Sequence, residues 1–179
     1  MIPVSGTTLF TVLIVLVALE RVAELIVSQR NLRWSWERGG QEYGQGHYPV
    51  MVLLHLGLLV GALVEVHLAG RQMIPALAVP MLILVLGAQA LRWWCITSLG
   101  PRWNTRVVIV PGLPRVTGGP YAWLSHPNYV AVVIEGFALP LVGSAWVTAL
   151  VFTTLNAALL TVRIRTEDAA LSLLPVGAR

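Results

Sequence analysis

The chain has 179 residues, of which 56% are hydrophobic and only 11% are charged. A soluble domain carries about 25% charged residues, so we expect lipid to be the solvent of this chain. The net charge of +4 comes without a dense basic run that carries interleaved aromatic residues, which argues against nucleic acid as a partner. A single cysteine excludes an internal disulfide, and no metal-ligand spacing is present.

Five apolar segments follow one another along the chain. Their expected ranges are 7–28, 48–69, 74–97, 129–142 and 146–163. At roughly 20 residues for each membrane helix, these segments predict an all-α integral membrane protein with about five transmembrane helices. The last two are short and are joined by Gly143-Ser144-Ala145, which predicts a helical hairpin. We interpret residues 1–179 as a single domain.

The first segment is expected to remain in place as a helix. No basic residue precedes it and no A-x-A-like site follows it, as a cleaved signal peptide would require. Its second half carries Glu20, Arg21 and Glu24, and ionisable groups in a bilayer are costly. Either an internal ion pair near the cytoplasmic interface or a part in shaping a binding cavity would explain them.

The distribution of arginines predicts the orientation in the membrane. Most lie in the first loop, the third loop and the C-terminal stretch, namely Arg30, Arg33, Arg38, Arg102, Arg106, Arg115, Arg163, Arg165 and Arg179. The second loop has only Arg71 and the fourth has none. Basic loops face the cytoplasm, so we expect an inner-membrane protein with its N-terminus outside, its C-terminus cytoplasmic and a cofactor pocket on the cytoplasmic side.

Two further polar residues lie inside apolar segments. His55 is in the middle of the second segment, and Glu135 is about two turns into the fourth. A histidine in a helix is usually a packed, hydrogen-bonded group. A glutamate at this depth has to face protein or a wet cavity. We therefore consider both residues as candidates for contact with a substrate.

The most informative stretch is the loop that enters the fourth segment, residues 118–129. Two glycines, two prolines and a histidine make it turn-rich, and irregular backbone at a membrane boundary is tolerated where it lines a cavity or meets water. The fifth segment ends in a second polar cluster, in which Arg163 and Glu167 project from one helix face because they are four residues apart. The spacing of these residues alone does not predict which reaction the two clusters would catalyse.

Together, the two clusters resemble the isoprenylcysteine carboxyl methyltransferase family of integral membrane methyltransferases. The matching motifs are Gly119-Pro120-Tyr121, Ser125-His126-Pro127-Asn128-Tyr129 and Arg163-x-x-x-Glu167-Asp168-x-x-Leu171. Their order and spacing fit over residues 100–172, which would form the catalytic core. The resemblance implies S-adenosylmethionine as the methyl donor.

The N-terminal half resembles a narrower bacterial branch. Its motifs are Glu20-Arg21-x-x-Glu24, Ser28-x-Arg30-Asn31, Gly46-His47-Tyr48-Pro49 and His55. Members of this branch are associated with type III polyketide synthases and methylate an oxygen of alkylpyrones. The resemblance therefore implies an O-methyltransferase for a lipophilic acceptor that presents an anionic oxygen.

Residue roles follow from the resemblance. It implies cofactor contacts by Val116, Tyr121, His126, Pro127, Asn128, Tyr129 and Glu167. Arg163 would meet the acceptor, with His55 and Glu135 as further acceptor contacts. Arg163 and Glu167 are thus the catalytic candidates, and no residue is assigned to a metal.

Two positions depart from the family pattern. Ser125 stands where the family usually has arginine, and the chain lacks the Phe-Gly…Tyr tail of the prenylcysteine enzymes. The missing tail favours a pyrone over a prenylated protein as the acceptor. A carboxyl methyltransferase for a prenylcysteine-like or other lipid acid, a reductase, and a non-catalytic transport or assembly protein remain alternatives. The sequence does not predict the oligomeric state.

Overall fold

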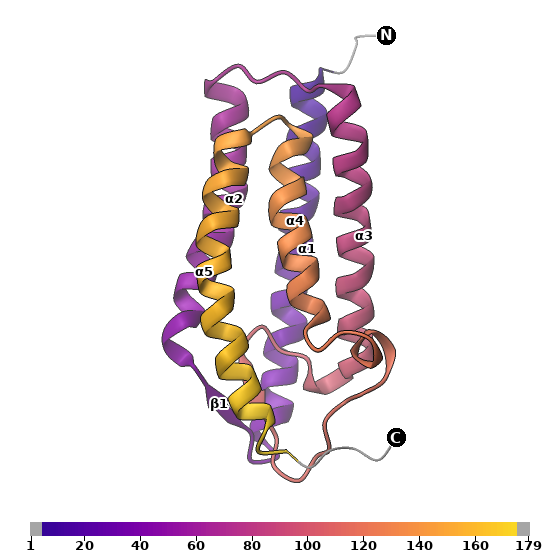
Figure 1. Ribbon diagram of the computed structural model, residues 1–179, viewed down its shortest axis with the longest axis vertical. Helices are drawn as coiled ribbons and strands as arrows, with labels where there is room; N and C mark the ends of the chain where they lie inside the picture. The colour runs from indigo at the N-terminus through magenta and orange to yellow at the C-terminus, as the bar shows by residue number, and fades with distance from the viewer. Residues whose placement is uncertain (1–4, 175–179) are drawn as a thin grey trace.

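The computed structural model describes residues 5–174 and is built mainly from five α-helices. The helices are α1 (Gly6–Trp36), α2 (Tyr48–Leu68), α3 (Pro75–Leu99), α4 (Pro127–Val142) and α5 (Trp146–Leu171). They run side by side along the long axis of the molecule (Figure 1), with α4 packed against both α3 and α5, and α5 packed against α2. The predicted all-α architecture and the hairpin of the last two helices are confirmed.

Three of the described helical segments are long and apolar enough to cross a membrane, namely Gln45–Leu68, Pro75–Arg102 and Trp146–Leu171. They make the chain an integral membrane protein. The helix α4 is apolar but has only 16 residues, and α1 carries Glu20, Arg21 and Glu24 within its length. That all five helices cross the membrane stays a prediction.

Two helices continue past their predicted ends. The helix α1 ends at Trp36 instead of residue 28, and α5 ends at Leu171 instead of residue 163. The expected ends were placed where charged residues begin, but a helix needs no lipid to continue when its residues favour the helical state and pack against protein. Leu32 and Ser35 are buried in the extended part of α1, and Ala170 is buried in that of α5.

The two long loops meet at one end of the molecule, here called the loop end. There β1 (Gln41–Tyr43) pairs antiparallel with β2 (Val107–Ile109), with Glu42 opposite Val108. The short 3-10 helices η1 (Gln45–His47), η2 (Gly100–Arg102) and η3 (Gly119–Ala122) lie in the same two loops. The sequence analysis did not predict the strands.

The connections between α2 and α3 and between α4 and α5 lie at the opposite, closed end (Figure 1). The first and third loops and the end of α5 therefore share one end of the molecule, as the arginine pattern predicted. Arg179, which was part of that pattern, lies outside the described residues. Which end faces the cytoplasm stays a prediction.

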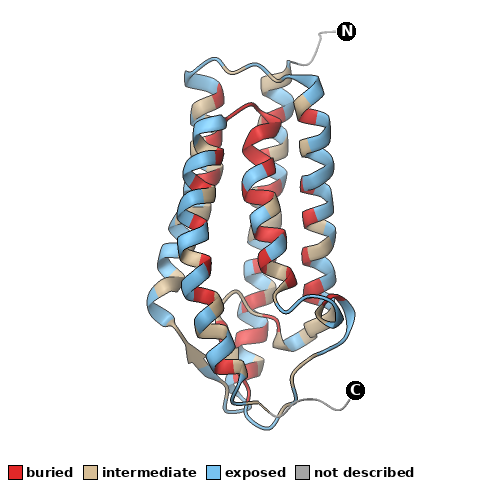
Figure 2. Ribbon diagram, in the orientation of Figure 1, coloured by how far each residue is buried: buried red, intermediate tan, exposed pale blue. Residues whose placement is uncertain are grey.

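The hydrophobic core fills the closed end. Its buried members are Phe10, Ile14, Val17, Ala62, Val66, Ala78, Val85, Ala138, Leu139, Val142 and Ala145. Figure 2 shows that α4 has the densest run of buried residues, as expected of the helix with neighbours on several sides. The turn after α4 needs Gly143, because a Cβ there would lie 2.8 Å from the ring of Phe10.

A buried charge network joins α1, α3 and α4 below this core. Its members are Glu20, Arg21, Glu24, Gln89, Arg92 and Glu135. The Arg21 guanidinium donates to Glu24 at 2.8 Å, and its Nη2 lies 3.2 Å from a carboxylate oxygen of Glu135. Arg92 is bonded to the same oxygen of Glu135.

The network confirms the internal ion pair expected for Arg21 but gives it more partners than the sequence predicted. Arg92 of α3 is buried and pairs with Glu24 as well as with Glu135. A buried charge is tolerated when it is paired and hydrogen-bonded. The pairing therefore fixes how α1, α3 and α4 lie relative to one another.

Glu65 of α2 caps the start of α5. Its carboxylate accepts from the backbone N–H groups of Val147 and Thr148 at 3.2 and 2.8 Å, and from the Thr148 hydroxyl at 2.9 Å. Arg71 pairs with the same carboxylate at 3.1 Å. The residue before the helix, Ala145, has no side chain that could cap it, so Glu65 supplies the missing acceptor.

We expect Glu65→Ala to lower the stability of the protein, because the first N–H groups of α5 and Arg71 would both lose their partner. The loss of a cap costs about 0.5–2 kcal/mol. Thermal unfolding in detergent, followed by circular dichroism, measures the effect. His67→Ala, on the exposed side of the same helix turn, is the matched control, and an equal midpoint for both variants would contradict the capping role.

Candidate functional site

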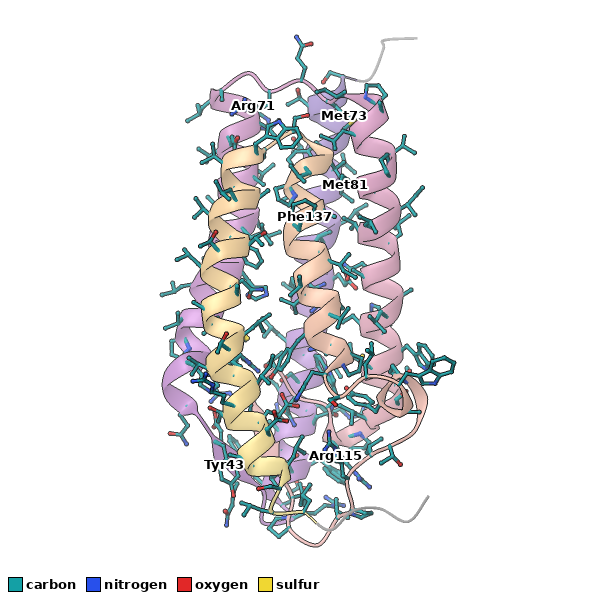
Figure 3. The ribbon with its side chains drawn as sticks, viewed as in Figure 1. Tyr43, Arg71, Met73, Met81, Arg115 and Phe137 are labelled. Carbon is teal, nitrogen blue, oxygen red and sulfur yellow. The ribbon has the colours of Figure 1, made fainter. Side chains whose placement is uncertain are left out.

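A cavity of about 490 Å³ lies between the helices on the loop-end side of the core. Residues of α1, α2, α4 and α5 form its walls, and the third loop, residues 100–126, forms much of its floor. Figure 3 shows Arg115 of that loop and Tyr43 of β1 at the loop end, far from Arg71 and Met73 at the closed end.

The cavity wall changes character along its length. The wall within the helices is mostly apolar and includes Ala18, Val22, Leu25, Val52, Leu56, Leu59, Val132, Leu159 and Leu160, with Arg21, Glu24, Arg92 and Asn156 among its polar members. The wall at the loop end is polar and includes Arg102, Asn104, Arg106, Ser125, His126, Asn128 and Glu167. Such a cavity fits an amphiphilic ligand whose tail lies among the helices, together with a polar ligand at the loop end.

The extended end of α1 holds the third loop in place. Ser28 accepts a hydrogen bond from the backbone N–H of Thr105 at 3.0 Å, and the two hydroxyls are 2.9 Å apart. Asn31 donates to the carbonyl oxygens of Trp103 and Gly100 at 2.8 and 3.2 Å. The part of α1 that the sequence analysis did not predict therefore positions one side of the cavity.

The short helix η3 packs on the end of α3 through Gly119. This glycine has a φ of +60°, and a Cβ there would lie 2.3 Å from the hydroxyl oxygen of Ser98. Only glycine fits both the backbone conformation and the close approach. The packing buries most of the Tyr121 side chain, and burial raises the pKa of its phenol.

His126 lies between the two carboxylates at the end of α5. Its Nε2 is hydrogen-bonded to Asp168 at 3.0 Å, and its Nδ1 lies 3.7 Å from a carboxylate oxygen of Glu167. The interaction with Glu167, reinforced by Asp168, raises the pKa of His126 against the opposing effect of burial. Tyr129 stacks on the imidazole and donates its hydroxyl to Glu167.

Arg163 is a buried cation with neutral partners. Its guanidinium donates to the carbonyl oxygen of Thr105 at 2.9 Å and to the hydroxyl of Tyr129 at 3.4 Å, and it contacts the sulfur of Met51. Its side chain is only 5% exposed. No carboxylate forms a salt bridge with Arg163 within residues 5–174, in contrast to Arg21 and Arg92.

Several buried polar atoms of the cavity wall have no hydrogen-bond partner among the described residues. At the loop end they are both amide atoms of Asn104, Oδ1 of Asn128 and Nδ1 of His126. Buried polar groups are almost always satisfied by protein, water or ligand. These atoms, together with the carboxylate of Glu167, fit a ligand that carries an ammonium group, hydroxyls and a heterocycle, as S-adenosylmethionine does.

The cavity brings together most of the residues that the family resemblance selected. Its wall contains Val116, Tyr121, His126, Asn128, Tyr129, Glu167, Arg163 and His55. Pro127 is buried at the first position of α4 and lies outside the wall. Glu135 also lies outside the wall, bonded to Arg92 and Arg21. The roles assigned to all of these residues stay predictions.

Sequence reasoning missed three residues of the site. Asn104 and Thr105 were not predicted because only the arginines of residues 102–106 entered the interpretation, and Met51 was not predicted because it lies in an apolar segment. The pair Asn104-Thr105 offered a signal, since it places uncharged polar side chains between two arginines of an interfacial loop. Nothing in the sequence indicated the contact between Met51 and Arg163.

Comparison with known proteins agrees with this geometry. The model of the isoprenylcysteine carboxyl methyltransferase (ICMT) family matches residues 81–173, which is more than half of the chain and includes η3, α4 and the charged part of α5. The sequence motifs that suggested the family all lie within that match.

Two bacterial proteins, both described as uncharacterized, are similar to the chain over most of their length. YpbQ of Bacillus subtilis is 37% identical over 163 residues, which cover 91% of this chain and 96% of that protein. A protein of Haemophilus influenzae is 26% identical over 153 residues, which cover 85% of this chain and 88% of that protein. With the family match, these similarities show that the chain belongs to the isoprenylcysteine carboxyl methyltransferase family, a family of membrane methyltransferases.

Proposed function

We propose that the protein is an S-adenosylmethionine-dependent O-methyltransferase that acts on a lipophilic acceptor with an anionic oxygen. An alkylpyrone-type polyketide is the acceptor that we put first. The observation that carries the proposal is the buried guanidinium of Arg163 in the wall of an amphiphilic cavity. Family membership supports the reaction type, since it implies methyl transfer.

Arg163 calls for an anionic partner. Burying an ion away from water costs several kcal/mol, and the cost is offset only when an opposite charge or several hydrogen bonds meet it. The described protein groups give Arg163 a carbonyl, a hydroxyl and a thioether, but no negative charge. An acceptor oxygen that carries charge would complete the coordination, and a guanidinium is well suited to planar oxygen acids.

The loop end of the cavity suits the cofactor. When bound, S-adenosylmethionine supplies an activated methyl group on a positively charged sulfur. The carboxylate of Glu167 would hold a cationic group of the cofactor, and His126, positioned by Asp168, would contribute Nδ1. Asn104 and Asn128 would bond the ribose or the base through amide atoms that have no described protein partner.

The apolar wall suits the tail of the acceptor. Leu56 and Leu59 of α2 and Leu159 and Leu160 of α5 line the part of the cavity within the helices. An alkyl chain there would gain about 0.8 kcal/mol for each buried CH₂ group relative to water. A lipid carboxylate would meet the same wall and the same Arg163, so a carboxyl methyltransferase is the alternative that product analysis has to separate.

The first experiment is calorimetric titration of the detergent-solubilised protein with S-adenosylhomocysteine and, in parallel, with NADPH. We expect saturable binding of S-adenosylhomocysteine alone. Incubation with S-adenosylmethionine and a panel of alkylpyrones and lipid acids then identifies the product by mass. NADPH binding would overturn the proposal in favour of a reductase, and folded protein that binds neither ligand would favour a non-catalytic role.

Arg163→Met should reduce methyl transfer by about 10²-fold or more, which corresponds to at least 2.7 kcal/mol of transition-state stabilisation. We expect the affinity for S-adenosylhomocysteine to change little, because the guanidinium would meet the acceptor. Steady-state kinetics and calorimetry measure the two quantities. The exposed Arg165→Met, two residues along α5, is the control, and equal losses of rate and cofactor affinity would refute the assignment.

His126→Ala should have the opposite pattern and weaken the binding of S-adenosylhomocysteine first. A loss of about tenfold corresponds to 1.4 kcal/mol, in the range expected for one hydrogen bond to a charged group. Calorimetry of the variant, with His67→Ala as the control, gives the comparison. A cofactor affinity equal to that of the wild type would show that His126 lies outside the cofactor site.

A further inference from the structure

His55 has a defined tautomer in the structure. Its Nδ1 lies 2.8 Å from the carbonyl oxygen of Met51, one turn earlier in α2. A carbonyl can only accept a hydrogen bond, so Nδ1 carries the proton, and in a neutral ring Nε2 is left with a lone pair. His55 lines the cavity, and its Nε2 has no hydrogen-bond partner among residues 5–174.

The ring of His55 is also held in place from the side. It packs edge-on against Phe152 of α5, with the ring centroids 5.4 Å apart and an angle of 85° between the planes. Phe152 is itself buried and packs against Gly136 of α4. A Cβ atom at position 136 would lie 2.0 Å from the Phe152 ring, so the ring fits only beside a glycine. The hydrogen bond and the aromatic contact together preorganise Nε2.

Within residues 5–174, His55 lacks an anionic partner that would favour its protonated form. No carboxylate forms a salt bridge with it among the described residues, and the charged groups whose fields reach it are Arg21 of α1, Arg92 of α3 and Glu135 of α4. Glu135 is already bonded to both of these arginines. A neutral imidazole in this setting is a proton acceptor.

His55 and Arg163 face the same part of the cavity. Met51 links them, since its carbonyl oxygen bonds His55 and its sulfur contacts a guanidinium nitrogen of Arg163. Successive turns of a helix are about 5.4 Å apart, so a single polar head group can reach both side chains. The cavity thus presents a proton acceptor and a buried cation to one ligand.

We infer that His55 is the proton acceptor for a hydroxyl group of the acceptor, so the acceptor enters as a weakly acidic enol or phenol whose oxygen becomes anionic in the site, and not as a carboxylic acid. This inference rests on the proposed function. The O–H bond breaks, its proton moves to Nε2 of His55, and its electron pair stays on the oxygen, which becomes an anion opposite Arg163. Charge is conserved, because a neutral hydroxyl and a neutral imidazole give an oxyanion and an imidazolium.

The chemistry of the two acceptor classes explains why the residue matters. A carboxyl group ionises near pH 4, so it arrives as an anion at neutral pH and needs no base, whereas a phenol ionises near pH 10. A positioned general base contributes about 10²–10⁴-fold to the rate of such a reaction. A neutral histidine beside the cation is of use only to the hydroxyl class.

The test follows the proton in the full-length, detergent-solubilised protein. The probe is a nitrophenol with a long alkyl chain, whose anion absorbs visible light, at a pH below its ionisation in solution. We expect the wild type to bind it as the coloured anion, with no net proton released. Calorimetry in phosphate and in Tris, which differ in ionisation enthalpy, counts the protons. A bound anion that releases one proton to the buffer would overturn the inference, as would a bound probe that stays protonated.

A variant and a spectroscopic measurement sharpen this test. His55→Asn should bind the probe either colourless or with release of one proton, while His67→Asn should match the wild type. If His55→Asn fails to fold, NMR of ¹⁵N-histidine-labelled wild type still reports whether Nε2 becomes protonated when the probe binds. An Nε2 signal that keeps its unprotonated shift while the probe is bound as an anion would refute the proposal.

Methyl transfer separates this inference from the proposed function. We expect His55→Asn to lower kcat/KM for a long-chain alkylphenol about 10²-fold more than for a lipid carboxylic acid. An equal loss of kcat/KM for both acceptors would show that His55 has only a structural role. Proton transfer to His55 in a protein that transfers no methyl group would refute the proposed function alone, and methyl transfer that is independent of His55 would refute this inference alone.

Discussion

The cost of placing charge among apolar helices is the constraint on which this structure depends. Arg21, Arg92 and Glu135 come from three different helices, and none could be buried without the others. Removing one partner of such a buried pair leaves an uncompensated charge and lowers the free energy of unfolding by about 3–5 kcal/mol. The network therefore ties α1, α3 and α4 together, and its members Arg21, Glu24 and Arg92 also line the cavity.

Arg163 differs from the arginines of the network in its partners. The fold compensates the arginines of the network with carboxylates, yet it holds Arg163 with a carbonyl, a hydroxyl and a sulfur. The nearby carboxylate of Glu167 is bonded to Tyr129 and faces His126. The hydroxyl of Tyr129 thus lies between the carboxylate of Glu167 and the guanidinium of Arg163, an arrangement that suits the cationic donor and anionic acceptor proposed above.

Composition and motif order predicted the helical fold, the hairpin and the grouping of the cavity residues, because hydrophobic runs and helix periodicity are local properties. The charge network was predicted only for Arg21 and the neighbouring glutamates, since the partners Arg92 and Glu135 are distant in sequence and only packing brings them together. The extension of α1 escaped prediction for a similar reason. Its polar residues, such as Asn31, bind loop carbonyls. A hydropathy pattern does not reveal such contacts, because it records only where apolar residues fall along the helix.

The short ribbon of β1 and β2 has a mechanical consequence. The strand β1 leads through η1 into α2, which carries Met51 and His55, while β2 begins two residues after Thr105, whose carbonyl oxygen holds Arg163. Glu42 and Arg106, bonded at 2.9 Å beside the ribbon, strengthen the link. The ribbon therefore joins the third loop to the start of α2, and with it the loop end of the cavity to the wall that carries Met51 and His55.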